Sequence, residues 1–259
     1  MTTMPASPFV QVGVLTGRSL LGLRDPRMIV MNLLQPMIML TLFSQVFRTM
    51  ADAPGFPPGV EYLDYLMPAI LVTTGAQAAV WAGGGLANDL KNGVLARFRT
   101  LPVTMVAVVA ARSLFDLTRS ALQLLTLLVA AMLLFGFHPP GGVLGSLGAL
   151  VLALVVGTGL GAVFMALAAW VKNGELLQTI GMATMFPLMF ASSAFVPVGN
   201  LPGWLRAVAV VNPLTYAVDA ARGFALGAAA WPALAAALGV SSVLLVAGLG
   251  LAARGVRRP

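Results

Sequence analysis

Residues 195–223 read FVPVGNLPGWLRAVAVVNPLTYAVDAARG, an apolar stretch that proline interrupts at three places. Pro197, Pro202 and Pro213 lack the backbone N–H that the interior of an α-helix requires, so no single helix can run through the stretch. The residues between the prolines are too apolar for an ordinary solvated loop. We therefore expect short helices that dip into the outer leaflet of a membrane.

Four side chains of the same stretch fit this interpretation. Trp204 and Tyr216 are of the kind that gathers at the level of lipid headgroups. Asp219 and Arg222 are three residues apart, a spacing at which opposite charges can pair on one helix face. We expect this pair to stabilise the segment.

Composition places the whole chain in a membrane. Hydrophobic residues make up 59% and charged residues 9% of 259 residues, and the mean hydropathy is +0.94. A soluble domain carries about 25% charged residues, so lipid must cover most of this surface. The chain has no cysteine, which excludes disulfides and thiolate metal sites. We expect one all-α integral membrane domain over residues 1–259.

Hydropathy predicts six transmembrane helices, because about 20 mostly apolar residues are needed to cross the hydrocarbon core. The fifth is the least regular, since Pro187 interrupts it. The first is long enough to span, so we do not expect a cleavable signal peptide. The predicted spans are residues 28–46, 65–86, 111–135, 143–170, 176–196 and 234–253.

The basic residues predict the orientation of these spans. The net charge is +7, and thirteen of the fifteen basic residues are arginine, a bias typical of GC-rich bacterial genomes. Twelve fall on the side of the two chain ends, and only Arg48, Arg206 and Arg222 fall on the other. Because cytoplasmic loops collect Lys and Arg, we expect a multi-pass protein of a bacterial cell membrane with both termini in the cytoplasm.

Two further segments are expected at the cytoplasmic surface. Residues 9–24 are apolar enough to bind a membrane and too short to cross it, which favours an interfacial helix over an irregular tail. Residues 88–103, NDLKNGVLARFRTLPV, predict a short amphipathic helix capped by Asn88 or Asp89 and ended before Pro102. Its basic side could lie on anionic lipid headgroups, or it could bind a soluble partner.

These segments together resemble the permease subunits of ABC-2 type exporters, and most closely the daunorubicin/doxorubicin-resistance branch. The resemblance rests on YLMPAI at residues 65–70, on DLKNGVLARFRTLPV at residues 89–103, and on the stretch at residues 195–222. It implies the type V exporter fold, with six transmembrane helices, an N-terminal interfacial helix and external re-entrant helices.

The resemblance also implies roles for particular residues. Residues 88–102 would form a coupling helix set in a cleft of a cytoplasmic ATPase, and the loop at residues 172–175 would be a second contact. The implied ATPase-coupling residues are Asp89, Lys91, Gly93, Leu95, Arg97, Phe98, Arg99, Pro102, Lys172 and Glu175. The implied residues of the external re-entrant segment, 195–223, are Pro197, Leu201, Pro202, Trp204, Asn212, Pro213, Tyr216, Asp219 and Arg222.

Partners follow from the same resemblance. Two copies of an ABC ATPase would dock below two permease copies, with the first and fifth spans nearest the dimer axis. ATP and Mg would bind only to the ATPase, and a hydrophobic drug-like or lipid-like molecule would be the substrate, with no role for nucleic acid. Export of a lipid-linked glycan or polyketide lipid, and a non-transporting scaffold or sensor, are the alternatives.

The residues themselves point away from catalysis and metal binding. The sequence has no G-x-x-x-x-G-K-[ST] phosphate loop, so we do not expect it to hydrolyse ATP. His138, the only histidine, precedes two prolines in a predicted turn, which favours a loop residue over a metal ligand. Arg112, Asp116 and Arg119 can share one helix face; a structural ion cluster is favoured there over a substrate or proton site.

Two residue types bear on packing and on substrate. Gly157, Gly159 and Gly161 would permit close helix approach in the fourth span. The methionines of the first and fifth spans, Met31, Met39 and Met189 among them, could present an adaptable surface to varied hydrophobic substrates. Ordinary packed or lipid-facing positions explain those methionines equally well.

Overall fold

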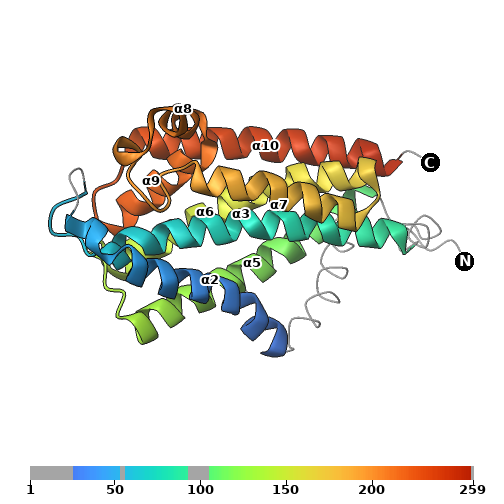
Figure 1. Ribbon diagram of the computed structural model, residues 1–259. Coiled ribbons are helices and arrows are strands. Elements are labelled where there is room, and N and C mark those ends of the chain that lie inside the picture. The colour runs from blue at the N-terminus through green and yellow to red at the C-terminus, as the bar shows by residue number, and fades with distance from the viewer. Residues whose placement is uncertain (1–25, 53–55, 93–104, 258–259) are drawn as a thin grey trace, which may run out of the picture.

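The chain folds as a bundle of helices in the computed structural model (Figure 1), which describes residues 26–52, 56–92 and 105–257. No strand occurs among these residues, which confirms the all-α expectation. The elements in order are α2 (Pro26–Val46), η2 (Arg48–Asp52), α3 (Tyr62–Lys91), α5 (Met105–Phe135), α6 (Gly142–Val171), α7 (Gly174–Phe190), η3 (Val198–Asn200), α8 (Gly203–Val211), α9 (Pro213–Ala225) and α10 (Trp231–Arg257).

Glycines bring three of the long helices into backbone contact. A Cβ added to Gly157 of α6 would lie 2.6 Å from the carbonyl oxygen of Gly75 in α3. On the other side of α6, a Cβ on Gly159 would lie 2.7 Å from the carbonyl oxygen of Ser241 in α10. Only a residue without a Cβ fits at such distances, so α6 is held between α3 and α10. The close approach was predicted from the glycines, whereas the partner helices were not.

The remaining helices pack around this centre. α7 lies against α3, and α2 and α5 contact both α3 and each other. Of the most apolar 18 residues of α3, 83% are buried, against 22% for α5, so α3 is an interior helix although its composition resembles that of a lipid-facing span. The outer helices carry exposed apolar side chains, among them Leu34, Ile38 and Leu42 of α2.

Among the described residues, four helices are long and apolar enough to cross a membrane: Tyr62–Lys91, Ala110–Phe135, Gly142–Val171 and Trp231–Gly255. They correspond to four of the six predicted spans. The described apolar part of α2, Val30–Val46, is shorter, and the 17 residues of α7 rise about 26 Å. Within the described residues, length and composition therefore support four of the six predicted spans and leave the other two as predictions.

The fifth predicted span was wrong at its C-terminal end. The apolar run continues to Val196, but α7 ends at Phe190. Pro187 lies inside α7 and does not end it. The helix can end within an apolar run because side chains from other helices bond the carbonyls of the residues that follow: Asn212 bonds Ala191, Arg222 bonds Ser193, and Tyr62 bonds Phe195.

Replacing Gly248 of α10 by alanine is expected to lower the melting temperature of the purified chain. The added Cβ would lie 2.5 Å from the carbonyl carbon of Ala162 in α6, and overpacking of this kind costs about 1–3 kcal/mol. Thermal unfolding in detergent, followed by tryptophan fluorescence, measures the change.

Gly239 and Gly250 of the same helix are matched controls, because a Cβ there meets no heavy atom within 4 Å. Alanine at either control position should leave the melting temperature unchanged or raise it, since alanine has the higher helix propensity. Equal melting temperatures for Gly248→Ala and Gly239→Ala would contradict the close contact of α10 with α6.

Candidate functional site

The proline-rich stretch forms two short helices at one end of the bundle (Figure 1). Pro202 immediately precedes α8, and Pro213 is the first residue of α9, where a missing N–H costs no helical hydrogen bond. The chain turns between them at Asn212. The prediction that no continuous helix crosses this stretch is confirmed.

Asn212 joins the start of α9 to the end of α7. Its Oδ1 accepts a hydrogen bond of 2.9 Å from the backbone N–H of Leu214, which caps α9. Its Nδ2 donates to the carbonyl oxygens of Leu188, at 2.7 Å, and Ala191, at 2.6 Å. Leu188 lies in the last turn of α7 and Ala191 is its C-cap residue, and carbonyls at a helix end have no further helical N–H to bond them. One buried amide therefore satisfies both helix ends.

Arg222 lies under the same segment and is 7% exposed. Its Nη1 donates to Asp219 at 3.1 Å, which confirms the expected pair. Its Nε and Nη2 donate to the carbonyl oxygens of Tyr65 and Ser193, at 3.2 and 2.9 Å. The guanidinium also lies 3.5 Å from the centre of the Tyr65 ring. Arg222 thus joins α9 both to α3 and to the chain that follows α7.

These extra contacts bear on a double variant in which the charges of Asp219 and Arg222 are exchanged. They limit how far the exchange can restore the fold. Ser193 Oγ also donates to Asp219, at 2.6 Å, so each charged group has partners besides the other. A carboxylate at position 222 would face the carbonyl oxygens of Tyr65 and Ser193, which only a donor can satisfy. Reversing both charges should therefore not restore the fold, although the two side chains do pair.

The other predicted residues of the segment, such as Pro202 and Trp204, lie closer to the surface than Asn212 and Arg222. Trp204 is 73% exposed, and the hydroxyl of Tyr216 donates to the carbonyl of Val210. Leu201 and Pro197 flank η3, and Arg206 donates to the carbonyl of Gly199.

At the opposite end of the bundle, Arg112 of α5 bridges two carboxylates. Its Nη1 lies 2.9 Å from Asp89 at the end of α3, and its Nε lies 3.1 Å from Asp116 one turn further along α5. A Cβ on Gly85 would overlap the guanidinium, so this glycine provides its space. The sequence predicted a cluster with Asp116 but not the bridge to Asp89.

The predicted helix start at Asn88 or Asp89 is wrong, because α3 continues through both residues to Lys91 and is followed by Asn92. The buried face of α3 extends to Leu86 and Ala87, and this tertiary packing overrides a local capping signal. Most of the predicted coupling helix lies outside the described residues, and so do residues 9–24. The coupling residues concerned are Gly93, Leu95, Arg97, Phe98, Arg99 and Pro102.

The loop between α6 and α7 meets the end of α3. Lys172 ends α6 in the left-handed conformation, with φ of 53°, and Asn173 caps α7 by accepting from the N–H groups of Glu175 and Leu176. A Cβ on Gly174 would lie 2.7 Å from Oδ1 of Asn88. The structure thus places the loop at residues 172–175 beside Asn88, the first residue of the predicted coupling segment.

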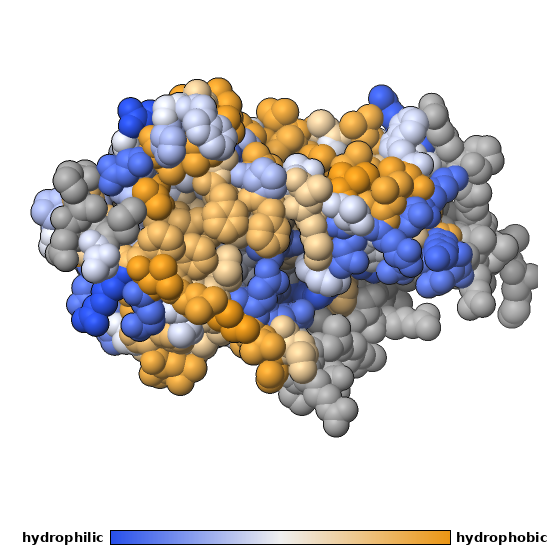
Figure 2. All heavy atoms as spheres, in the orientation of Figure 1, coloured by the Kyte–Doolittle hydropathy of each residue, from blue (hydrophilic) through white to orange (hydrophobic). Residues whose placement is uncertain are grey.

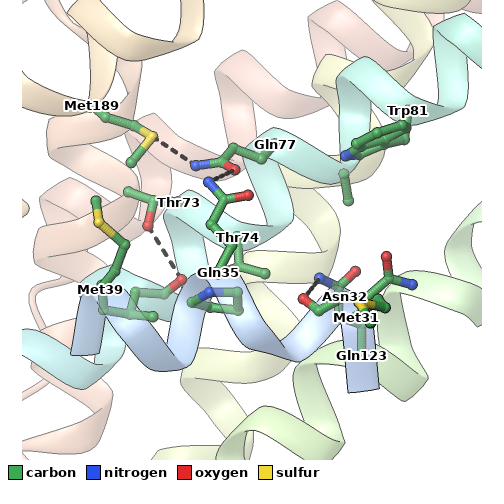
Figure 3. A pocket seen from close by; sticks show the side chains of 13 residues that line it. Met31, Asn32, Gln35, Met39, Thr73, Thr74, Gln77, Trp81, Gln123 and Met189 are labelled. Carbon is green, nitrogen blue, oxygen red and sulfur yellow. Dashed lines mark hydrogen bonds between the residues drawn. The ribbon is translucent and has the colours of Figure 1, made fainter. Parts of the chain in front are cut away.

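Between the two ends, a pocket of about 110 Å³ lies among α2, α3, α5 and Met189 of α7 (Figure 3). Gln35 Nε2 donates to Oε1 of Gln77 at 3.0 Å, and Gln77 Nε2 contacts the sulfur of Met189 at 3.2 Å. Gln123 donates to the backbone carbonyl of Asn32 at 3.1 Å. Figure 2 shows a hydrophilic area between α2 and α7, bordered by hydrophobic areas in the middle of this face.

Sequence reasoning missed this pocket, although a signal was available. Gln35, Gln77 and Gln123 are uncharged polar residues within three predicted spans, where each amide requires a partner. Metal chemistry has no comparable support, because the described residues contain no group of three or more His, Cys, Asp or Glu that could hold an ion.

These features define a multi-pass membrane protein whose two ends differ. Its described residues include four helices of membrane length, the broken α8–α9 segment at one end and the charged cluster of Arg112 at the other. The chain belongs to the ABC-2 type transporter family, whose family model matches residues 10–226. It is accordingly a permease subunit of an ABC exporter, which implies an ATPase partner and a membrane location.

Three relatives illustrate the range of the family. The daunorubicin resistance ABC transporter permease protein DrrB1 of Streptomyces coeruleorubidus is 33% identical over 82% of this chain and 73% of its own length. The putative transport permease ycf38 of Porphyra purpurea is 27% identical over 77% and 68%. A probable doxorubicin resistance ABC transporter permease protein DrrC of Mycobacterium tuberculosis is 25% identical over 62% and 58%.

Replacing Asn212 by aspartate is expected to destabilise the chain at least as much as replacing it by alanine. Aspartate is among the best helix N-caps, but it cannot donate to the carbonyls of Leu188 and Ala191. An unsatisfied buried partner costs about 1–3 kcal/mol. Melting temperatures of the two variants measure the effect. If Asn212→Asp is as stable as the parent, Asn212 acts only as the N-cap of α9 and its bonds to the α7 end do not contribute to stability.

Proposed function

We propose that two copies of this chain form the membrane part of an exporter that moves hydrophobic drug-like or lipid-like molecules out of a bacterial cell. Two copies of a separate ATPase supply the energy and bind ATP and Mg. The observation that carries the coupling part of this proposal is the contact of Gly174 with Asn88. It joins two candidate ATPase contacts that are far apart in the sequence.

The charged cluster supports a route for force from the ATPase into the bundle. The residues that follow α3 carry Arg97 and Arg99, which the family resemblance assigns to ATPase docking. Arg112 ties the last turn of α3 to α5 through Asp89. A push on the segment after α3 would therefore be passed to α5 as well as to α3.

In the assembly we propose, the charged end lies in the cytoplasm and the α8–α9 segment lies in the outer leaflet. Lys91, Lys172 and Arg254 lie at or near helix ends that share the charged end. The positive-inside rule supports the cytoplasmic assignment. α2 and α7 complete six spans and line the path between the two copies. The names of the drug-resistance relatives support an amphiphilic drug as the substrate.

Export itself is tested with inside-out vesicles that contain the chain and its ATPase. We expect ATP-driven uptake of daunorubicin that is abolished when the nucleotide is omitted. A fluorescent phospholipid measured in parallel separates the drug from the lipid alternative. Absence of ATP-driven uptake of both probes would overturn the proposed export function.

Coupling is tested by Arg97→Glu and Leu95→Asp, which place an acidic group on the basic or the apolar side of the expected coupling helix. Both variants should reach the membrane but lose co-purification with the ATPase and the stimulation of its ATP hydrolysis. Arg254→Glu is the matched control, since Arg254 is an exposed arginine near the same end on α10. Unchanged complex and unchanged hydrolysis in Arg97→Glu would rule out the coupling role.

A further inference from the structure

The glutamines of the central pocket differ in how well their hydrogen-bonding groups are satisfied. Gln77 lies at the middle of α3, fifteen residues after Tyr62 and fourteen before Lys91. At that depth of a membrane each polar group requires a partner in the protein, in a ligand or in a water-filled cavity. The Oε1 of Gln77 accepts from Gln35, and among the described residues its Nε2 donates to the sulfur of Met189. A thioether is a weak acceptor, so this donor is held only weakly.

Gln123 has a different and purely structural task. Pro36 lies inside α2 and has no N–H, so the carbonyl of Asn32, four residues earlier, loses its helical donor. The side chain of Gln123 supplies that donor at 3.1 Å and fastens α2 to α5. The side-chain amide of Gln123 is therefore needed by the backbone carbonyl of Asn32, whereas the amide of Gln77 can leave the sulfur of Met189 for another acceptor.

The pocket has the size of part of a ligand. A cavity of about 110 Å³ is smaller than the roughly 150 Å³ that encloses benzene, and far below the 300–1,000 Å³ of typical sites for drug-sized molecules. The pocket can accommodate the polar edge of one ring. The rest of a bound molecule must lie outside, on the exposed apolar face of α2.

The walls of the pocket divide into a buried floor and an exposed mouth. Ile70 and Met189 are each 2% exposed and form the floor, whereas Trp81 and Met31 are 52% and 69% exposed at the mouth. Trp81 lies one helical turn beyond Gln77 on α3 (Figure 3). An indole ring and a flexible thioether next to a weakly bonded amide donor suit a flat, oxygen-bearing ring.

We infer that this pocket binds the hydroxyl- or carbonyl-bearing ring of an exported planar amphiphile. The Nε2 of Gln77 leaves the sulfur of Met189 and donates to a ligand oxygen. Trp81 packs on the ring face, and the apolar body of the ligand lies along α2. This inference rests on the proposed export function and names the substrate class: planar ring compounds rather than acyl-chain lipids.

The test measures binding directly, with the full chain in lipid nanodiscs. Trp170, Trp204 and Trp231 are replaced by phenylalanine, so that Trp81 is the only tryptophan of the four. Daunorubicin, a planar chromophore, is titrated as the probe. We expect saturable quenching of Trp81 fluorescence. Gln77→Leu should raise the Kd about tenfold, the effect of losing about 1.4 kcal/mol.

Two further variants separate ligand contact from a structural effect. Met189→Leu keeps the apolar volume but removes the sulfur that competes for Gln77 Nε2, so it should lower the Kd. Gln178→Leu on α7 is the matched control, because Gln178 does not line the pocket, and its Kd should equal that of the parent. Met189→Leu alone decides the matter if Gln77→Leu does not fold.

The pocket assignment is overturned by non-saturable quenching, by an unchanged Kd in Gln77→Leu, or by an unchanged or raised Kd in Met189→Leu. Equal quenching by a brominated phospholipid would also overturn it, since an acyl-chain lipid would then occupy the site. The vesicle assay keeps the two proposals apart. If Gln77→Leu supports uptake with an unchanged half-saturating concentration, the pocket assignment is wrong and the export function stands. If the chain binds the drug saturably but no uptake occurs, the export function is wrong and the binding pocket stands.

Discussion

The contact of α6 with α3 on one side and α10 on the other is the constraint on which the rest of the structure depends. Lipid tails are as apolar as leucine side chains, so helices in a bilayer gain little from burying apolar surface and rely on close packing instead. Gly157 and Gly159 lie in one turn of α6, and they allow close packing against α3 and α10, respectively. The same helix also seats the α8–α9 segment, because Gly141 donates to the carbonyl of Ala225 at 2.7 Å, and a Cβ on Gly145 would overlap the carbonyl of Phe224.

The broken segment at one end follows from a second constraint, the need to satisfy backbone carbonyls in an apolar environment. Where α7 ends, the following chain has no helix or sheet to supply donors. Asn212 and Arg222 supply them from α9, and Tyr62 supplies another from α3. The Asn-Pro step and the Asp/Arg pair therefore occur together for a structural reason: the first turns the chain and caps α9, and the second holds α9 over the end of α7.

Sequence alone predicted what depends on local composition. The four long helices were visible as apolar runs, and the division of residues 195–223 was visible from Pro202 and Pro213. The end of α7 at Phe190 was not, because the donors that permit it come from residues 22 or more positions later or from α3. For the same reason, the sequence did not predict the bridge from Arg112 to Asp89 or the amide contact between Gln35 and Gln77. Each joins residues more than 20 positions apart, and hydropathy carries no information about which distant side chains meet.

The backbone contacts among α3, α6 and α10 also have a mechanical consequence. Helices that touch through glycine cannot slide past one another without a clash, so the three should tilt as one stiff lever rather than flex. α3 has 30 residues and is about 45 Å long, so a tilt of about 5° at its charged end would displace the opposite end by about 4 Å. Because Arg222 bonds the carbonyl of Tyr65 near the start of α3, that displacement would move α9 with it.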